Sequence, residues 1–466
     1  MPIAAHASTI GSEPHGGGMM TFAAKPGAQR PPRIVRGEGL YLWDTNGRRL
    51  IDGSSGPVAV NLGHGNKRIL AAMQAQACKV TFTHYSQFES EANLELADLL
   101  TGLAGQDFER AWFCSGGSEA VEATLKFCRQ HAVMTGQGTR WKVISRATSY
   151  HGNTLGALSV TGDTNAHAMF GPMMQSMPKV PTPFSYRVPD NFTVESYARH
   201  CATELERAIE REGPESALAF IMEPVGGVST GALVVPDEYI RMVRDICTRH
   251  GVLLIFDEVI TGVGRTGKFL AAHHLPEARP DLIVLAKGLT GGYTPFGAML
   301  APASMVATVA NGGGFMHGHT YTGNPMSCAI AHAALSEVVD RKLADNAARM
   351  GAVLKDKLHA LAARTPLVGD VRGKGLLCAL EIVADKATKR MTPLEHVAPS
   401  RLQALALEQG LSIYCRRTNG GRDGDWVMVS PPLIAELHHI DEIVASLERT
   451  LRALADELVT KGVKLG

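Results

Sequence analysis

The chain has 466 residues, of which 45% are hydrophobic and 20% are charged, and its formal net charge is +1. This apolar content is enough for a large core divided between two domains. No long basic run and no apolar stretch of ~18 residues occurs, so the sequence predicts neither a nucleic-acid partner nor a membrane association.

The cysteines and the N-terminus indicate a compartment. The eight cysteines are scattered, form no Cys-x-x-Cys pair and in several cases lie within apolar runs. This pattern is typical of reduced core thiols. The N-terminus lacks a basic segment followed by an apolar one, so no secretory signal is predicted. We therefore expect a cytoplasmic protein.

The first elements in chain order are an extension and a hairpin. Residues 1–32 are rich in Gly, Ala, His and Pro without periodicity, which predicts a poorly ordered extension or an arm that contacts a partner. Residues 38–52 alternate around Asn46-Gly47, a dipeptide typical of the turn in a β-hairpin.

From about residue 110 to 302, short apolar strands alternate with helical patterns. Strands are predicted at 110–114, 141–146, 217–223, 252–257, 281–287 and 296–301, and helices at 118–131, 236–250 and 324–341. This alternation predicts an α/β fold whose large domain has a mostly parallel sheet with helices on both faces. Ligands bind at the carboxyl ends of such strands.

The rest of the chain is predicted to form a smaller α+β domain. Its last helix has an apolar face that recurs every three or four residues from Ile440 to Leu458. We expect residues 1–75 to form the arm and part of this small domain, 76–341 the large domain, and 342–466 the C-terminal part of the small domain.

Lys287 and Asp257 are the most informative pair of residues. Each follows an apolar strand, so both are expected at one edge of the sheet, where burial lowers the pKa of a lysine and frees its amine. Pyridoxal phosphate needs such a pair, because a lysine condenses with its aldehyde and an acid holds its ring nitrogen.

Three further motifs fit a flat, phosphorylated ligand, although each has an ordinary structural alternative. Gly116, Gly117 and Ser118 open a helix where free backbone N–H groups favour an anion, but a capped strand–helix turn has the same sequence. Tyr150 follows a strand and could stack on a ring or pack in a loop. Thr320 opens another helix and could bind an oxyanion or belong to a helix cap.

Taken together, these motifs resemble a known family. The segments that carry the resemblance are Ser115–Ala120, Tyr150–Gly152, Glu223–Val225, Asp257–Arg265, Ala286–Leu289 and His317–Pro325, which occur in the family's order. Over about residues 33–460 the chain resembles a class III aminotransferase of pyridoxal-phosphate fold type I. The large domain would then be the cofactor-binding domain.

The resemblance implies a role for each motif. Lys287 resembles the Schiff-base lysine and proton carrier, and Asp257 the partner of the pyridine nitrogen. Val259 and Tyr150 resemble the residues on the two ring faces, and Thr320 a phosphate contact from the neighbouring subunit of a homodimer with sites at its interface. The remaining cofactor-binding residues implied by the family are Ser115, Gly116, Gly117, Ser118, His151 and Glu223.

The substrate side is less clearly defined. Arg416 or Arg417 lies where many relatives keep a mobile arginine for the α-keto acid, but the adjacent pair and its long polar turn depart from the pattern. Tyr85 is a candidate pocket wall. Small residues occupy 54–59, where pyruvate-dependent relatives often have a tryptophan.

The leading hypothesis is transfer of an amino group from a primary amine or ω-amino acid to an α-keto acid, with pyruvate as the expected acceptor. The alternative is a decarboxylase or aminomutase on the same scaffold. A third possibility, a catalytically silent protein, is disfavoured because Lys287 and Asp257 are both present.

Two groups of residues are not assigned to chemistry. The pairs His273/His274 and His317/His319 have no carboxylate at ligand spacing, so no metal site is predicted. Arg265 is expected to hold the loop after Asp257 rather than to bind substrate.

Overall fold

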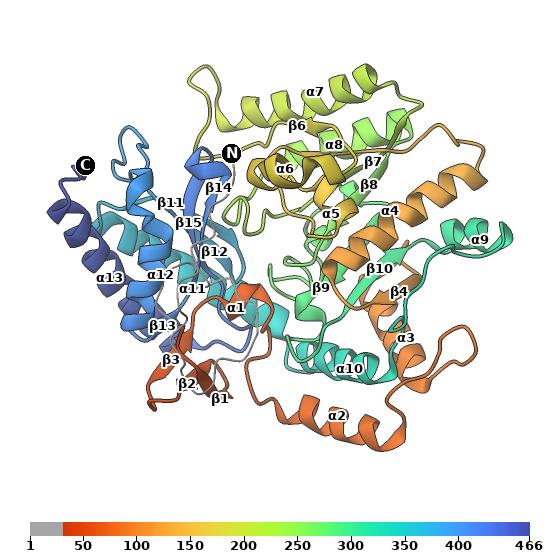
Figure 1. The fold of residues 1–466 in the computed structure, drawn as a ribbon, viewed down its shortest axis with the longest axis horizontal. Helices are drawn as coiled ribbons and strands as arrows, with labels where there is room; N and C mark the ends of the chain where they lie inside the picture. Colours follow the sequence, from red (N-terminus) through yellow and green to blue (C-terminus); the bar gives the residue numbers. More distant parts are fainter. Residues whose placement is uncertain (1–30) are drawn as a thin grey trace, which may run out of the picture.

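A computed structural model describes residues 31–466, so most of the predicted N-terminal extension lies outside the described residues. Its central feature is a seven-stranded sheet (Figure 1). In spatial order its strands are β4 (Arg110–Cys114), β10 (Gly297–Ala301), β9 (Leu282–Ala286), β8 (Leu253–Asp257), β7 (Ala217–Met222), β5 (Lys142–Arg146) and β6 (Lys179–Val180). Only β10 runs antiparallel to its two neighbours, which confirms the predicted mostly parallel sheet.

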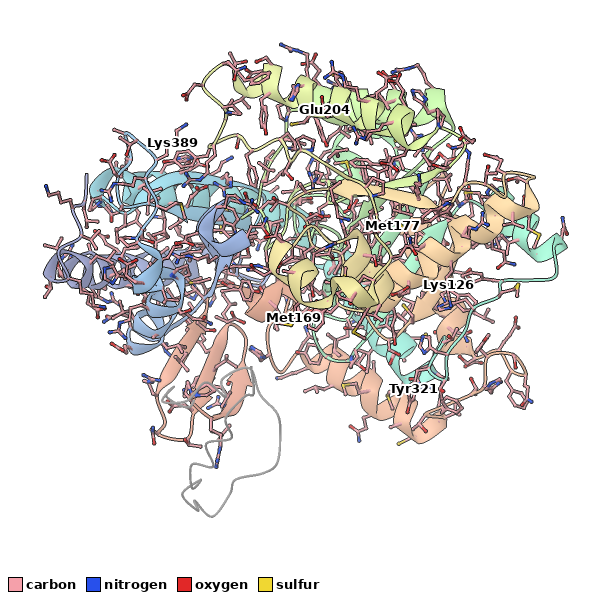
Figure 2. All side chains as sticks on the ribbon, turned by 45° about the horizontal axis from the view of Figure 1, so that its top comes forward. Lys126, Met169, Met177, Glu204, Tyr321 and Lys389 are labelled. Carbon is pink, nitrogen blue, oxygen red and sulfur yellow. The ribbon has the colours of Figure 1, made fainter. Side chains whose placement is uncertain are left out.

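Helices cover both faces of this sheet. Successive side chains of β9 point to opposite faces, so Leu282 and Val284 pack in one apolar cluster while Ile283 and Leu285 pack in the other. The first cluster includes residues of α4 (Gly117–Met134), α5 (Leu155–Val160) and α9 (Ala303–Asn311). The second includes residues of α2 (Lys67–Lys79), α3 (Glu91–Ala104), α7 (Val194–Glu212), α8 (Asp237–His250) and α10 (Pro325–Asp340). Figure 2 shows the described side chains as sticks on the ribbon.

Two four-stranded sheets form the smaller part, on the left of Figure 1. One joins β1 (Ile34–Glu38), β2 (Tyr41–Asp44), β3 (Arg49–Asp52) and β13 (Leu411–Ser412); the other joins β11 (Val368–Lys374), β12 (Leu377–Ile382), β15 (Gly424–Val429) and β14 (Tyr414–Thr418). Its helices are α11 (Leu343–Arg364), α12 (Ala398–Glu408) and α13 (Leu437–Thr460).

The pairing of β3 with β13 brings the N-terminal strands beside the C-terminal part of the chain. This agrees with the expectation that both contribute to one small domain, although the division at residues 75 and 341 stays a prediction. The predicted hairpin turn at Asn46-Gly47 is confirmed, since β2 and β3 pair around it. Strand β1 extends this hairpin to a third strand.

Several short helices and turns make up the rest of the secondary structure in the described residues. They are α1 (Ser55–Val58), α6 (Thr164–Phe170) and the 3₁₀ turns Gly171–Met173, Ala271–His274, Pro276–Ala278, Lys287–Leu289, Leu394–His396 and Asn419–Gly421. Among residues 31–466, no helix is both long enough and apolar enough to cross a bilayer.

Arg265 joins the large sheet to the smaller part. Its fully buried guanidinium donates to the backbone oxygens of Leu376 and Pro431, and to Oδ1 of Asn61 at 2.6 Å. These acceptors come from three separate segments of the chain. The geometry therefore agrees with the structural role expected for Arg265.

Candidate active site

A cavity of about 390 Å³ opens at the carboxyl ends of the parallel strands. Asp257 ends β8, Glu223 follows β7 and Lys287 follows β9, so three neighbouring strands deliver their side chains to one place. The cavity also includes these predicted site residues: Ser115, Gly116, Gly117, Ser118, Tyr150, His151 and Val259.

Lys287 enters this cavity from a constrained backbone. Its φ of 45° lies in the left-handed region, which is unusual for a lysine and typical of functional sites when the surroundings enforce it. Burial lowers the pKa of its amine to about 8, against the opposing effect of the carboxylates of Asp257 and Glu223. A lysine with this pKa has a substantial neutral fraction near physiological pH, as a nucleophile requires.

Asp257 is buried and fixed by two hydrogen bonds. Its Oδ2 lies 2.8 Å from Nδ1 of His151, and its Oδ1 accepts from the backbone N–H of Val259 at 3.1 Å. His151, predicted as a cofactor-binding residue, lines the cavity and also orients this carboxylate. The carboxylate therefore has a single defined position in the cavity wall.

The start of α4 forms the polar end of the cavity. Gly116 precedes the helix, and no side chain caps its first amides, so these N–H groups are available to an anion. Gly117 leaves space, because a Cβ there would come within 3.3 Å of both methyl groups of Val259. The hydroxyl of Ser118 accepts from the N–H of Asn153 at 3.0 Å and can still donate its own hydrogen.

These features together fit pyridoxal phosphate. The cavity offers donors for a phosphate, an amine for the aldehyde and a fixed carboxylate for the ring nitrogen. Tyr150 and Val259, the two residues expected at the ring faces, both line it.

Glu223 lines the cavity, but its carboxylate is already engaged. The buried guanidinium of Arg146 donates to the backbone oxygen of Glu223 at 2.8 Å and lies 3.3 Å from its Oε2, and the N–H of Gly227 donates to Oε1 at 3.1 Å. Arg146 was not among the predicted site residues. Its position at the end of a predicted strand was the one available signal.

The structure separates the two adjacent arginines. Arg416 lines a second cavity of about 360 Å³, which adjoins the first through Lys287 and Tyr150. Its guanidinium carbon lies 5.7 Å from the centre of the Tyr150 ring. Arg417 instead donates to both carboxylate oxygens of Asp425, at 2.7 and 2.5 Å, and Asp425 is fully buried.

Tyr85 and Thr320 are not among the residues that line either cavity within one chain. The exposed Tyr85 ring packs edge-on against Trp112 at 5.8 Å, and its hydroxyl lies beside Gly318 in the same loop as the exposed Thr320. Both residues therefore belong to one surface of the described chain.

The histidines of the first pair, His273 and His274, make ordinary contacts with backbone oxygens. Nε2 of His273 lies 3.0 Å from the backbone oxygen of Ala104, and Nε2 of His274 lies 3.1 Å from that of Thr266. In the described part of the chain, no group of three or more potential ligands is arranged for a metal.

Comparisons with known proteins agree with this geometry. A family model described as aminotransferase class-III matches residues 23–451. Relatives include a diaminobutyrate–2-oxoglutarate transaminase of Halomonas elongata, 35% identical over 93% of this chain and 92% of its own. Another is a putrescine–pyruvate aminotransferase of Pseudomonas aeruginosa, 31% identical over 90% of each chain.

Among solved structures, an amine transaminase from an uncultivated Pseudomonas species, determined with pyridoxal phosphate bound, superposes with a TM-score of 0.87. It is 35% identical, and the match covers 95% of this chain and 99% of that one. The chain therefore belongs to the class III aminotransferases, pyridoxal-phosphate-dependent enzymes of fold type I.

Proposed function

We propose that this aminotransferase moves the amino group of a primary amine or ω-amino acid to pyruvate. The observation that carries the proposal is that the two cavities share Lys287 and Tyr150 in their walls. The first cavity holds the amine and carboxylate that fit the cofactor. The second provides a guanidinium, Arg416, at the place where a substrate would extend from Lys287.

The residues of the cofactor cavity have distinct proposed roles. Bound pyridoxal phosphate supplies a carbonyl that condenses with amines and a ring that accepts electrons from the substrate carbon. Lys287 binds the cofactor through Nζ and then carries the proton to and from that carbon. Asp257 keeps the ring nitrogen protonated, because a fixed negative charge raises the pKa of a neighbouring base. The N–H groups of Gly117 and Ser118 bind the phosphate.

The number of cationic side chains that line the two cavities favours pyruvate as the acceptor. Besides Lys287, Arg416 is the one lysine or arginine among the described residues that line the two cavities. A single guanidinium pairs with one carboxylate in a bidentate manner, which suits a keto acid with one carboxylate. The acceptors named for the two relatives differ, so this assignment rests on the chain's own residues.

The donor is inferred from the wall of the second cavity. Pro57, Leu158, Ala166 and Val228 contribute apolar surface there. Such a wall favours an amine with an apolar substituent over a second charged group.

A homodimer is proposed because the surface that carries Thr320 is apolar and exposed. The Phe82 and Tyr321 rings pack edge-on at 6.1 Å, and the exposed Tyr85 and Met316 lie in the same two segments. Clustered exposed apolar residues mark association surfaces. A second copy that covers this surface would bring Thr320 to the partner's cofactor phosphate and Tyr85 to the wall of the partner's site.

Complementation tests this arrangement. In a heterodimer of Lys287→Ala and Thr320→Ala chains, both defects fall in one site if Thr320 acts across the interface, so the other site is complete. Recovery of activity and of tight cofactor binding in verified heterodimers supports the proposal. Thr320 serving its own chain would leave no complete site, and activity would not return.

Substrate use is tested by a matrix of assays. The holoenzyme is incubated with simple primary amines or ω-amino acids, each with pyruvate, with 2-oxoglutarate or without acceptor. Alanine formed only with pyruvate supports the proposal. Glutamate formed preferentially from 2-oxoglutarate would replace the acceptor, and carbon dioxide or an isomerised amine without acceptor would indicate a decarboxylase or aminomutase.

We also propose a cytoplasmic location. Cys114, Cys128 and Cys201 are among the buried cysteines with free thiols, and free thiols persist in a reducing compartment. Fractionation of the producing cell with compartment markers checks this assignment.

A further inference from the structure

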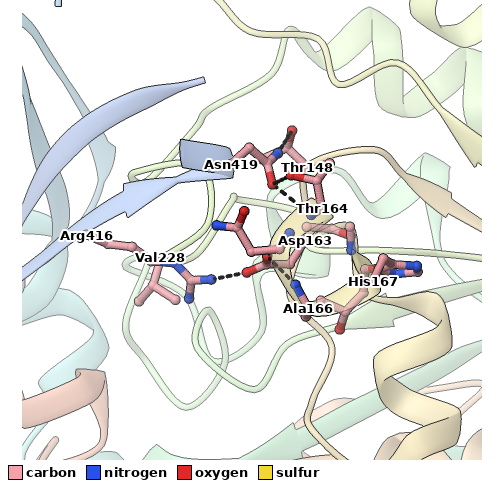
Figure 3. A network of polar contacts seen from close by, with 12 residues as sticks. Thr148, Asp163, Thr164, Ala166, His167, Val228, Arg416 and Asn419 are labelled. Carbon is pink, nitrogen blue, oxygen red and sulfur yellow. Dashed lines mark hydrogen bonds and ion pairs between the residues drawn. The ribbon is translucent and has the colours of Figure 1, made fainter. Parts of the chain in front are cut away.

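The ion pair between Arg416 and Asp163 borders the second cavity. The guanidinium of Arg416 on β14 donates to Oδ2 of Asp163 at 2.9 Å, and Figure 3 shows this contact bridging from β14 to the start of α6. Both side chains line the cavity and are partly exposed, at 19% and 20%. The proposed carboxylate-binding arginine thus already has a carboxylate of the chain itself as its partner.

Asp163 is held in place independently of this ion pair. Its Oδ1 accepts from the backbone N–H groups of Asn165 and Ala166, at 3.0 and 3.2 Å, and so caps α6. The two oxygens therefore have separate tasks: Oδ1 fixes the carboxylate to the helix, and Oδ2 faces Arg416. Loss of Arg416 as a partner would leave the cap intact.

A network next to the ion pair fixes α6 against the end of β14. Oδ1 of Asn419 accepts from the N–H and the hydroxyl of Thr164, at 2.9 and 3.0 Å. The amide nitrogen of Asn419 donates to Asp423, which also accepts from the hydroxyl of Thr148 at 2.8 Å. Since both backbones are tied together (Figure 3), a change of partner for Arg416 requires movement of its own side chain alone.

The other charged groups near the two cavities are held more firmly than the pair of Arg416 and Asp163. Glu223 is engaged by Arg146 and Gly227, and Asp257 by His151 and Val259. Arg417 illustrates the opposite arrangement, because two contacts to the fully buried Asp425 lock it. A contact from one nitrogen to one partly exposed oxygen is more easily exchanged.

We propose that Asp163 is an exchangeable counter-ion that sets how the site discriminates between carboxylates and uncharged groups. This inference rests on the proposed function, in which Arg416 binds the keto-acid carboxylate. A substrate carboxylate displaces Asp163 and takes the guanidinium. A donor without a carboxylate leaves the pair intact, so its apolar substituent does not face an unpaired charge. Asp163 is in this sense a positioning residue that acts through Arg416.

Asp163→Asn isolates the charge, because asparagine caps helices as well as aspartate does. We expect the KM for pyruvate to fall about twofold to fivefold, the range for release of a partly exposed ion pair. The kcat/KM for a carboxylate-free amine should fall by a similar factor. Calorimetry with propionate, a carboxylate without a reacting group, should show tighter binding to the variant holoenzyme. Asp423→Asn, in the same network but without contact to Arg416, is the matched control and should change none of these three values.

Two further variants separate this inference from the function on which it rests. If Arg416→Ala impairs pyruvate use but Asp163→Asn leaves pyruvate KM and propionate affinity unchanged, the counter-ion role is wrong while the carboxylate site stands. If Arg416→Ala leaves pyruvate use unchanged, both proposals fail. In an Arg416→Ala background, Asp163→Asn should change pyruvate KM by a clearly smaller factor, because only direct repulsion between two carboxylates remains to be relieved. An effect of undiminished size there would show that Asp163 does not act through Arg416 and would overturn the inference.

Discussion

The proposed cofactor cavity and the second cavity, which contains Arg416, hold their charges in different ways. Asp257 is buried, and both of its oxygens accept hydrogen bonds from groups in the wall behind it. Arg416 is partly exposed, and its guanidinium meets one oxygen of Asp163 at the rim of the second cavity. The hydrogen bonds of Asp257 hold it in one position, whereas Arg416 can exchange its ion-pair partner.

The difference matches what each side must do during transamination. The protonated ring nitrogen must be stabilised in both half-reactions. A carboxylate that is already fixed in position does this without having to move, which is favourable on the cofactor side. The substrate side must accept an amine and then a keto acid in the same place. A guanidinium that pairs with Asp163 when no carboxylate is bound, and with the substrate carboxylate when one is, meets this requirement.

The largest effect is expected from Asp257→Asn, which removes the fixed charge. Turnover should fall at least ~100-fold, on the scale of ~3 kcal/mol for a lost electrostatic contribution. The adjacent Glu258→Gln is the matched control. Glu258 is buried and accepts from the N–H groups of Ala271 and Ala272, at 2.6 and 2.8 Å, and does not line the cavity. Its loss should lower the melting temperature but not kcat per folded enzyme, and near-normal kcat in Asp257→Asn would refute the rigid-charge account.

The two arginines should respond differently to truncation. Arg416→Ala should lower kcat/KM for pyruvate by about 30-fold, or about 2 kcal/mol, with a much smaller effect on an amine without a carboxylate. Arg417→Ala leaves the buried Asp425 without its cation and should cost about 3 kcal/mol of unfolding free energy with little change in pyruvate kinetics. Steady-state kinetics and denaturant unfolding of both variants check this pair. The reverse pattern would assign the carboxylate site to Arg417.

A smaller effect is expected from pH on cofactor recombination. The pKa of Lys287 is lowered to about 8 because burial disfavours the ammonium, and only the neutral amine reacts with the aldehyde. The rate at which the cofactor-free enzyme recombines with pyridoxal phosphate should therefore rise about tenfold from pH 7 to 9 and then level off. Stopped-flow absorbance measures it. A rate that still rises steeply above pH 10 would mean that Lys287 is not desolvated.

A second buried lysine, Lys179, offers an internal control for that measurement. Burial also lowers the pKa of Lys179, to about 7, but its amine donates to the backbone oxygen of Ser159, and it does not line the cofactor cavity. Lys179→Met should leave the recombination profile unchanged. A shift of the profile in this variant would show that the profile does not report Lys287.

The same contrast explains how much could be predicted from sequence. Lys287, Asp257 and the start of α4 follow directly from strands in a parallel sheet, so short-range patterns predicted that they would meet at one edge. Arg416, by contrast, is brought to its partner Asp163 by the packing of β14 against α6, a contact between residues 253 positions apart. No local pattern encodes it, which is why Arg416 and Arg417 could not be distinguished beforehand.

Other features depended on tertiary contacts in the same way. The partnership of Arg146 with Glu223 and that of His151 with Asp257 join different strand ends, and neither pairing was predicted. The helices α4, α8, α10 and α13 and the strands of the large sheet other than β6 were predicted because each has a clear apolar pattern, whereas α7 and α11 were not predicted. The strand β6 has two residues, Lys179 and Val180, too few to produce a pattern.

Lys287 is the central residue of the proposed site, because it is expected to hold the cofactor. Reduction of the purified holoenzyme with borohydride fixes the cofactor to the amine that carries it, and peptide mapping by mass spectrometry then locates the label. We expect the label on the peptide that contains Lys287, with Lys179 and all other lysines unlabelled. A stoichiometric label on any other lysine would contradict the assignment and the site built around it.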